Sequence, residues 1–282
     1  MSNTLAIVFD FDDTLAPDST SAFLDACGVD VRDFWSRRVQ AHLDDGWDPT
    51  PAFLYEMVVE SRSRPPGARI TRQRLSEFGR GLALFNGVAR IFGMLKRHVG
   101  RVNPAAELEF YLVTSGIGDM VRQCAISRNF VEVWSSDFHY NADGEIEFPR
   151  NLVSFTDKTR YLFQVSKGLI GPAARRDPFA VNRKMPGGTR RVPFEQMIFV
   201  GDGYTDVPCF SLVRQYGGLA IGVYNRDAPE KWRRAWGFVE DNRVSNLVPA
   251  DFGRKAPLHD ILVMATESIA KKIALRTASY QG

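Results

Sequence analysis

Four apolar runs along the chain, each three to five residues long, predict buried β-strands. They begin at Leu5, Phe110, Met197 and Leu219, and polar residues or glycines bound each of them. A continuous apolar run of this length is typical of a parallel strand that is buried on both faces, because a half-exposed strand alternates instead. The pattern therefore predicts an α/β fold with a doubly wound, Rossmann-like parallel sheet.

Helical periodicity fills the chain between the first two apolar runs. Apolar residues recur there at three- and four-residue spacings, and glycine, proline and capping residues interrupt the pattern. Short helices are predicted over residues 19–27, 33–43, 49–58 and 71–78. We therefore predict two structural units, a helical domain over residues 17–84 and an α/β core over residues 1–16 and 85–282.

The rest of the chain alternates helices with strands. A helix over residues 88–96 precedes the second apolar run, and this β-α-β order suits the right-handed connection of a doubly wound sheet. We predict a helix from Gly116 to about Phe130, then strands at 131–134 and 145–148 on either side of a turn at 141–144. Near the C-terminus, the pattern of apolar and polar residues predicts an amphipathic helix over residues 258–275.

An acidic cluster follows the first apolar run directly. Asp10, Asp12 and Asp13 lie within four positions of the end of that strand. Ligands of open α/β sheets bind at the carboxyl ends of the strands. Two carboxylates about 4 Å apart repel by roughly 4 kcal/mol at an effective dielectric near 20. Such a cluster persists only with a cation nearby or with raised pKa values.

Four motifs in order resemble those of the haloacid dehalogenase superfamily, nearest to its phosphoserine phosphatase branch. Each occurs at a strand end or a helix start, and together they cover nearly the whole chain. They are Asp10-x-Asp12-x-Thr14, the run Thr114-Ser115-Gly116 after a strand, Lys158 opening an amphipathic run, and Asp202 with Asp206 after a further strand. The resemblance implies a magnesium-dependent phosphohydrolase acting on a small phosphorylated metabolite, with residues 17–84 as a helical cap over the active site.

The first motif carries the expected chemistry. Asp10 is the expected nucleophile, forming an aspartyl-phosphate as carboxylates do in ATPases. Asp12 can protonate the departing alkoxide and then deprotonate the attacking water. Thr14 is expected on the phosphate-binding side of the site, where its hydroxyl would position Asp12 by a hydrogen bond.

The expected metal is Mg²⁺, a small hard ion that suits one or two carboxylates, several waters and a substrate phosphate. Asp10 and Asp202 are the expected direct carboxylate ligands. The resemblance implies that Asp12 also faces the metal through its backbone carbonyl. Asp206 is expected to act through water, with an outer-sphere or capping role as the alternative.

The second and third motifs are expected to hold the phosphate. Ser115 is predicted to end a strand and start a helix, where free backbone N–H groups attract anions, and Gly116 follows it. Thr114 is the competing choice, because strand alternation lets only one of the two hydroxyls face the site. Lys158 is expected to neutralise the phosphate and Asp10 together.

Three other functions compete with the phosphatase hypothesis. A signalling receiver accepts phosphate on an aspartate, but receivers are compact and lack a helical insertion of this size. An inactive scaffold or binding protein is disfavoured because every motif position is filled. A dehalogenase needs no metal, so Asp202 and Asp206 favour phosphate chemistry.

Composition sets broad limits on partners and location. The net charge is +3, and no apolar run reaches the roughly 18 residues of a membrane span. Because the first predicted strand begins at Leu5, we expect no signal peptide. Three scattered cysteines predict free thiols, and the four histidines show no catalytic or metal-binding spacing. We expect a cytoplasmic protein without nucleic-acid or membrane partners; the oligomeric state stays open.

Two further expectations concern specificity. The basic, glycine- and proline-rich segment at 168–192 is interpreted as a solvated surface excursion, with a flap over anionic substrate and a nucleic-acid contact as alternatives. Phosphoserine is not expected to be the main substrate, because no glutamate follows the first motif to meet the ammonium group. Asp18, after the rigid Pro17, is the only acid nearby.

Overall fold

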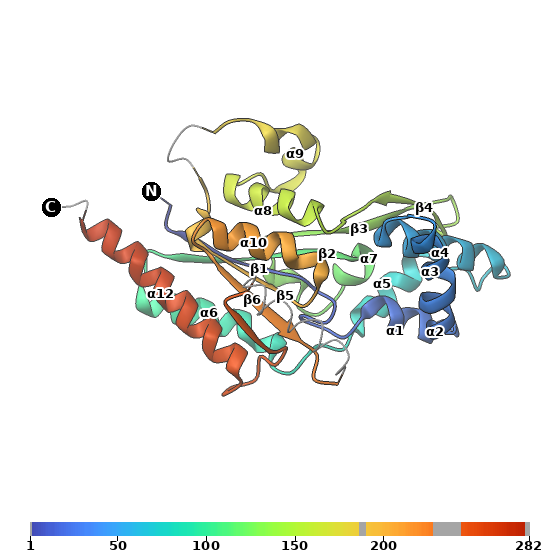
Figure 1. Ribbon diagram of the computed structural model, residues 1–282, viewed down its shortest axis with the longest axis horizontal. Coiled ribbons are helices and arrows are strands. Elements are labelled where there is room, and N and C mark those ends of the chain that lie inside the picture. The colour runs from blue at the N-terminus through green and yellow to red at the C-terminus, as the bar shows by residue number, and fades with distance from the viewer. Residues whose placement is uncertain (1, 186–189, 228–243, 280–282) are drawn as a thin grey trace.

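The computed structural model describes residues 2–185, 190–227 and 244–279. In this part of the chain, one sheet has the strand order β4-β3-β2-β1-β5-β6-β7 (Figure 1). Neighbouring strands are parallel, except that β3 and β4 are antiparallel. The strands are β1 (Thr4–Phe9), β2 (Glu107–Ile117), β3 (Glu132–Tyr140), β4 (Ile146–Asn151), β5 (Met197–Gly201), β6 (Leu219–Tyr224) and β7 (Asn246–Pro249). The predicted α/β sheet is confirmed, and β7 is a strand that the apolar pattern did not predict.

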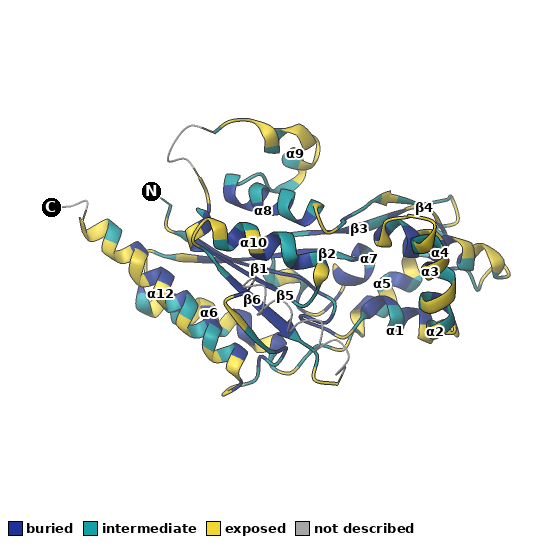
Figure 2. Ribbon diagram, viewed as in Figure 1, coloured by how far each residue is buried: buried dark blue, intermediate teal, exposed yellow. Residues whose placement is uncertain are grey.

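Helices cover both faces of this sheet, which is why its central strands are apolar throughout (Figures 1 and 2). Leu5, Ile7 and Phe9 of β1 pack with the helices on one face, whereas Ala6 and Val8 pack with those on the other. All five side chains are fully buried. The first face carries α6 (Val88–Val102) and α12 (Pro257–Ser279), and the second carries α8 (Asp157–Lys167) and α10 (Val207–Gln215).

The helical segment after β1 has an apolar core of its own. Phe34, Leu54 and Met57 are buried in it, and the same cluster includes Ile117 at the end of β2 and Phe138 of β3. The helices therefore pack on the carboxyl end of β2 and on the β3–β4 hairpin, beside the sheet rather than over its faces. They are α1 (Ser19–Ala26), α2 (Val31–Asp33), the π-helix η1 (Phe34–Val39), α3 (Gln40–Asp44), α4 (Pro49–Ser63) and α5 (Arg72–Arg80).

The helix predicted from Gly116 to Phe130 is wrong. β2 continues to Ile117, α7 (Gly118–Val121) is a single turn, and a 3₁₀ turn η2 (Ser127–Asn129) follows. The buried residues of this stretch serve two different cores, because Met120 packs with the helical segment whereas Val121 and Cys124 pack under the sheet. A continuous helix would present one apolar stripe to one core, so the chain breaks after one turn.

The basic segment at 168–192 is described except for 186–189. It contains α9 (Gly171–Arg175) and the 3₁₀ helix η3 (Pro178–Asn182), both near α8. Glu132 of β3 anchors it, accepting a hydrogen bond from the Gly171 N–H and pairing with Arg175, each at 2.6 Å. None of its described residues lines the pocket around Asp10. This part of the segment is therefore a surface excursion and not a flap over that pocket.

The cysteines and histidines have structural surroundings. The three cysteines are free thiols, as predicted, with Cys124 and Cys209 buried. His42 pairs with Glu56 at 2.7 Å and His98 with Glu267 at 3.1 Å, away from the acidic cluster. No described helix combines the length and apolar character needed to span a bilayer.

Candidate active site

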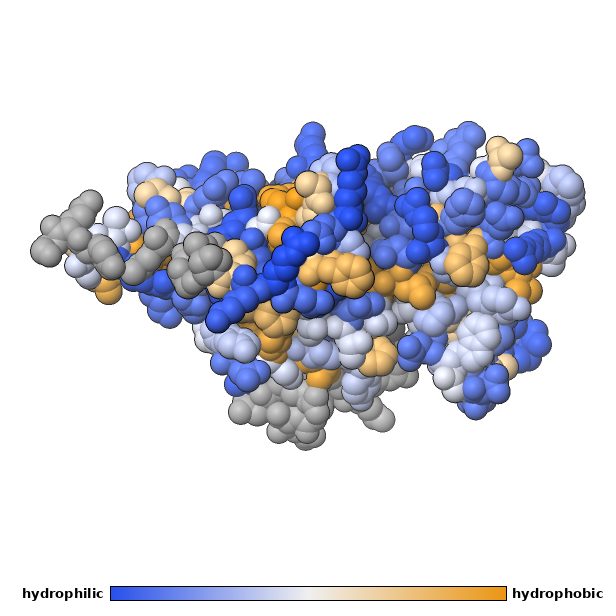
Figure 3. All heavy atoms as spheres, turned by 90° about the horizontal axis from the view of Figure 1, so that it is seen from above, coloured by the Kyte–Doolittle hydropathy of each residue, from blue (hydrophilic) through white to orange (hydrophobic). Residues whose placement is uncertain are grey.

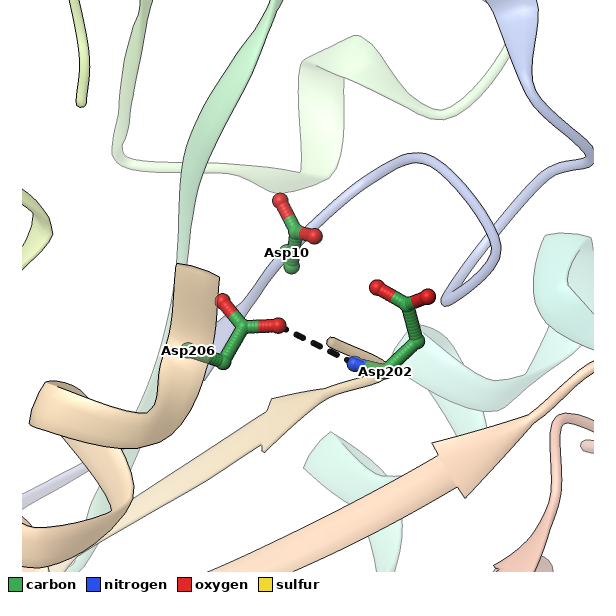
Figure 4. Close-up of side chains that lie close together, drawn as sticks. All are labelled: Asp10, Asp202 and Asp206. Carbon is green, nitrogen blue, oxygen red and sulfur yellow. Dashed lines mark hydrogen bonds between the residues drawn. The ribbon is translucent and has the colours of Figure 1, made fainter. Parts of the chain in front are cut away.

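The acidic cluster forms where β1 and β5 end side by side. Phe9 pairs in register with Val200, and the Asp10 N–H donates to the Val200 carbonyl at 2.9 Å. This register places Asp10 beside the loop after β5, which carries Asp202 and Asp206. One carboxylate oxygen from each of these three aspartates lies within 4.8 Å of the others (Figure 4). The structure thus brings together side chains that are almost 200 positions apart in the sequence.

Lys158 supplies a buried cation to this cluster. It is the second residue of α8, and its Nζ lies 3.0 Å from Asp10 Oδ1 and 2.7 Å from Asp206 Oδ1. Burial alone would lower the pKa of Lys158, but Asp10 and Asp206 outweigh that effect and raise it. Lys158 is therefore charged at neutral pH and holds the two carboxylates together.

Asp206 has a structural role at the end of β5. Its Oδ2 accepts hydrogen bonds from the backbone N–H groups of Asp202 and Gly203, at 3.1 and 3.2 Å. Its Oδ1 accepts from Lys158, and the side chain is fully buried. A Cβ on Gly201 would lie 2.4 Å from Asp206 Oδ2, so only glycine leaves room for this arrangement. Asp206 thus shapes the loop that presents Asp202, which agrees with the capping alternative.

Asp202 and Asp10 have the charge and ligand type that a divalent cation requires. Lys158 pairs with Asp10 and Asp206, and among the described residues no ion pair reaches Asp202. Burial, with Asp10 and Asp206 adding repulsion, raises the pKa of Asp202 well above its usual range. The cluster therefore holds three carboxylates against one ammonium group, and every candidate ligand atom is a hard oxygen. This arrangement fits Mg²⁺.

Burial also raises the pKa of Asp10 to about 7, with Asp206 adding to the increase and Lys158 opposing it. The carboxylate is only 5% exposed, so water stabilises its charge poorly. A cation at this position would restore the ionised form that a nucleophile needs.

Asp12 lies between the sheet and the first helix of the helical segment. Its Oδ1 accepts the backbone N–H of Ser19, the first residue of α1, at 2.7 Å. A Cβ on Gly116 would lie 2.6 Å from Asp12 Oδ2, so Gly116 is needed for β2 to approach this closely. Burial, followed by repulsion from Asp18, raises the pKa of Asp12 to about 7. A carboxyl group with this pKa can donate and accept a proton near neutral pH.

The two hydroxyls of the second motif differ in their hydrogen bonds. Thr114 Oγ1 accepts the Gly116 N–H at 2.9 Å, whereas Ser115 Oγ is buried without a partner among the described residues. Both residues line the pocket around Asp10. The unpaired hydroxyl favours Ser115 as the group that meets a ligand. The predicted helix start at Ser115 is wrong, because Ser115 lies within β2 and α7 begins only at Gly118.

Thr14 also departs from its prediction. Its hydroxyl is fully buried and has no hydrogen-bond partner among the described residues, so it does not position Asp12. The backbone N–H groups of Thr14, Leu15 and Ala16 all point at the Phe11 carbonyl, at 2.8–3.2 Å. This tight turn places the Thr14 side chain in the interior, and it does not line the pocket.

Comparisons with known proteins show that solved structures share this fold. No protein-family model matches the chain. An uncharacterized protein of Borreliella burgdorferi is 23% identical over 292 residues, which cover 92% of this chain and 95% of that protein. A HAD family hydrolase from Salmonella enterica subsp. enterica serovar Typhi has a TM-score of 0.55 at 14% identity over 82% of this chain, and the match spans 65% of that structure's length.

A phosphoserine phosphatase in its apo form has a TM-score of 0.56 at 12% identity, covering 92% of this chain and 98% of that structure. Another phosphoserine phosphatase structure, holding an analogue of the phospho-aspartyl intermediate, has a TM-score of 0.53 over 92% and 97% of the two chains. The chain has the haloacid dehalogenase-like fold. At these identities the likeness establishes the fold, and the activity has to be argued from the site.

In this haloacid dehalogenase-like structure the pocket includes residues that the sequence did not single out. It encloses about 180 Å³, and Thr20, Trp35 and Phe53 of the helical segment form part of its wall. Thr205 also lines it and accepts a hydrogen bond from Lys158 at 3.3 Å. Its position between Asp202 and Asp206 in the sequence could have indicated that Thr205 lies at the site. The adjacent aromatic residues at 34 and 35 gave no indication of which one faces the site.

Proposed function

We propose that the chain is a magnesium-dependent phosphohydrolase that removes phosphate from a small phosphorylated metabolite through an aspartyl-phosphate intermediate. The observation that carries the proposal is the group of Asp202 with the buried Asp10, Asp206 and Lys158 at the carboxyl ends of β1 and β5, in a pocket that the unpaired Ser115 also lines. Phosphoryl transfer needs an in-line nucleophile and positive charge around the phosphate oxygens. These side chains supply both.

The reaction is proposed to take place in two steps. A carboxylate oxygen of Asp10 attacks phosphorus, and the bond from phosphorus to the leaving oxygen breaks as Asp12 donates its proton to that oxygen. Asp12, now a carboxylate, then takes a proton from a water molecule that attacks the phosphorus. The bond between Asp10 and phosphorus breaks, which releases inorganic phosphate and restores both aspartates.

Other residues are proposed to hold the phosphate during both steps. The Lys158 ammonium and the Ser115 hydroxyl would bind its oxygens, and Gly116 leaves the space that the Asp12 carboxylate occupies beside them. Asp10, Asp202 and the backbone carbonyl of Asp12 would hold Mg²⁺, which neutralises charge on the phosphate when bound. Asp206 keeps Lys158 and the Asp202 loop in place.

We also propose that helices α1 to α5 act as the cap that selects the substrate. The pocket of about 180 Å³ is smaller than the 300–1,000 Å³ typical of sites for drug-sized ligands, which supports a small substrate. Trp35 and Phe53 give it an apolar wall, with ring centroids 5.7 Å apart. Asp18 lines the pocket but caps α1, accepting the Ser21 N–H at 2.9 Å and its hydroxyl at 2.7 Å. Both carboxylate oxygens of Asp18 thus already accept hydrogen bonds within α1 and are not free to meet an ammonium group. This supports the proposal that phosphoserine is not the main substrate.

A panel of phosphorylated metabolites, assayed for phosphate release with and without Mg²⁺, tests this function. We expect Mg²⁺-dependent release from at least one small phosphomonoester, and no release by the Asp10→Asn variant. Asp143→Asn, in the exposed turn between β3 and β4, is the matched control and should keep full activity. Turnover of a haloacid in metal-free buffer would instead identify a dehalogenase.

A further inference from the structure

A second, larger cavity lies beside α8. It encloses about 820 Å³ between the β3–β4 hairpin, α8 and α9, and it shares no lining residue with the pocket around Asp10. Figure 3 views the molecule from above, from the side of α8 and α9, and strongly hydrophilic side chains gather there between apolar patches. We call this cavity the arginine groove, after the residues that line it.

Positive charge dominates the arginine groove. Five arginines line it, and only two acids, Glu132 and Asp137, do so among the described residues. Each acid already has a partner, because Arg175 pairs with Glu132 and Arg122 pairs with Asp137. The five arginines come from separate segments around the cavity and are Arg122, Arg128, Arg150, Arg160 and Arg175.

Three of these guanidinium groups are left without a carboxylate at hydrogen-bonding distance. Arg128 and Arg150 are exposed and make no ion pair or side-chain hydrogen bond among the described residues. Arg160 lies over the Tyr161 ring, 4.6 Å from its centroid, and its Nη2 donates to the Tyr161 hydroxyl at 2.6 Å, whereas its ion-pair contact with Asp157 is 3.9 Å long. The Nε of Arg160 is buried with no hydrogen-bond partner. A buried donor without an acceptor is costly, so a bound acceptor would satisfy it.

We propose that the arginine groove binds an anion that carries a chain of phosphoryl groups, at a site separate from the proposed active site. Guanidinium groups bind phosphate oxygens in a bidentate manner. The unpaired Arg128 and Arg150 and the unsatisfied Nε of Arg160 lie on different elements, which suits several linked phosphates better than a single one. Trp134 and Tyr161 are not available for base stacking, since they are at least 92% buried and stack on each other at 5.2 Å, and the partly buried Phe130 packs edge-on against Phe92 of the core. The groove therefore recognises the phosphate chain, as found in inorganic polyphosphate or a nucleoside triphosphate.

Calorimetric titration of the full chain with inorganic tripolyphosphate tests this site. Buffers passed over a chelating resin remove divalent ions, so the acidic pocket around Asp10 repels the probe. We expect saturable binding at low salt that weakens at 150 mM NaCl, and at least tenfold weaker binding of inorganic monophosphate. A parallel titration with ATP distinguishes the two sources of the phosphate chain, and preference for either probe supports the site.

Two double variants assign the binding to the groove. Arg128→Ala with Arg150→Ala should weaken tripolyphosphate binding at least tenfold, and both positions are unpaired, so folding is preserved. Arg97→Ala with Arg101→Ala removes the same charge from exposed positions of α6 on the other side of the sheet, and should change binding less than twofold. Equal weakening by both double variants, no saturable binding, or tighter binding of a single-stranded oligonucleotide would each overturn the proposal.

Discussion

Replacing Asp10 with asparagine should abolish turnover and stabilise the metal-free protein at alkaline pH. The folded-state pKa of Asp10 is about 7, against an ordinary value of 3.8. A group whose pKa is raised by folding stabilises the folded state fully below its unfolded pKa. That contribution is lost as the pH rises through the folded pKa. For Asp10 the loss falls between about pH 4 and pH 7.

The size of the effect follows from the shift. About three pKa units at 1.36 kcal/mol each give roughly 4 kcal/mol. As Asp10 ionises between pH 4 and pH 8, the unfolding free energy of the wild-type protein should fall by this amount. The Asp10→Asn variant has no carboxyl group at this position, so its unfolding free energy should not show this fall. The advantage of the variant over wild type should therefore grow by on the order of 4 kcal/mol across that range, and the loss of the Asp10 charge that raises the pKa of Asp202 acts in the same direction. Differences in packing between the two side chains cancel, because they are the same at both pH values.

Urea unfolding at pH 4 and pH 8 in metal-free buffer measures this difference, and Asp143→Asn serves as the control with no such pH dependence. Adding Mg²⁺ at a hundredfold excess over its Kd should stabilise wild type by about 2.7 kcal/mol and the variant by less. Phosphate release measured on the same samples gives the catalytic effect. Equal pH dependence in wild type and variant, or a variant that keeps substantial activity, would refute the assignment of Asp10.

Further predictions address the groups around Asp10. Lys158→Met should lower the unfolding free energy at pH 7.5 by about 3–5 kcal/mol, because two buried carboxylates lose their counter-charge; urea unfolding measures it, and an unchanged midpoint would contradict the buried ion pairs. Gly116→Ala should reduce kcat at least 100-fold, because the new Cβ lies 2.6 Å from Asp12 Oδ2; initial-rate assays decide, and a normal kcat would show that Asp12 need not stay in place. Trp35→Leu should change KM values across the substrate panel more than kcat, since Trp35 belongs to the apolar wall that the helical segment contributes to the pocket; a selective loss of kcat would argue against this role. Ca²⁺ should fail to replace Mg²⁺ in phosphate-release assays, because it prefers more ligands at longer distances.

The sequence determined the sheet and the strand ends that carry the site. Buried parallel strands need apolar side chains on both faces, and this local requirement is visible as the runs starting at Leu5 and Met197. Because functional groups follow the carboxyl ends of such strands, Asp10 and Asp202 could be expected at one edge before their pairing was known. Lys158 was identified differently, through the family resemblance, as the residue that opens an amphipathic run.

Tertiary packing decided what local patterns could not. The segment after Ser115 contains enough apolar residues for a helix, but Met120 and Val121 belong to different cores, and only the packing shows this. The hydroxyl of Thr14 faces the interior because three backbone N–H groups converge on one carbonyl. No spacing rule specifies that turn.

The walls of the pocket and the arginine groove were likewise beyond the sequence. Trp35 and Phe53 line the same pocket as Asp10 only because the helical segment packs on the end of β2, and that arrangement depends on contacts between distant parts of the chain. The arginines at 128, 150 and 160 are scattered surface residues in the sequence. Strand pairing and the packing of α8 against the sheet gather them around one cavity. The local pattern of apolar residues thus predicts the strands and the carboxylates that follow them. Long-range packing decides which residues surround those carboxylates, and it leaves no periodic signal in the sequence.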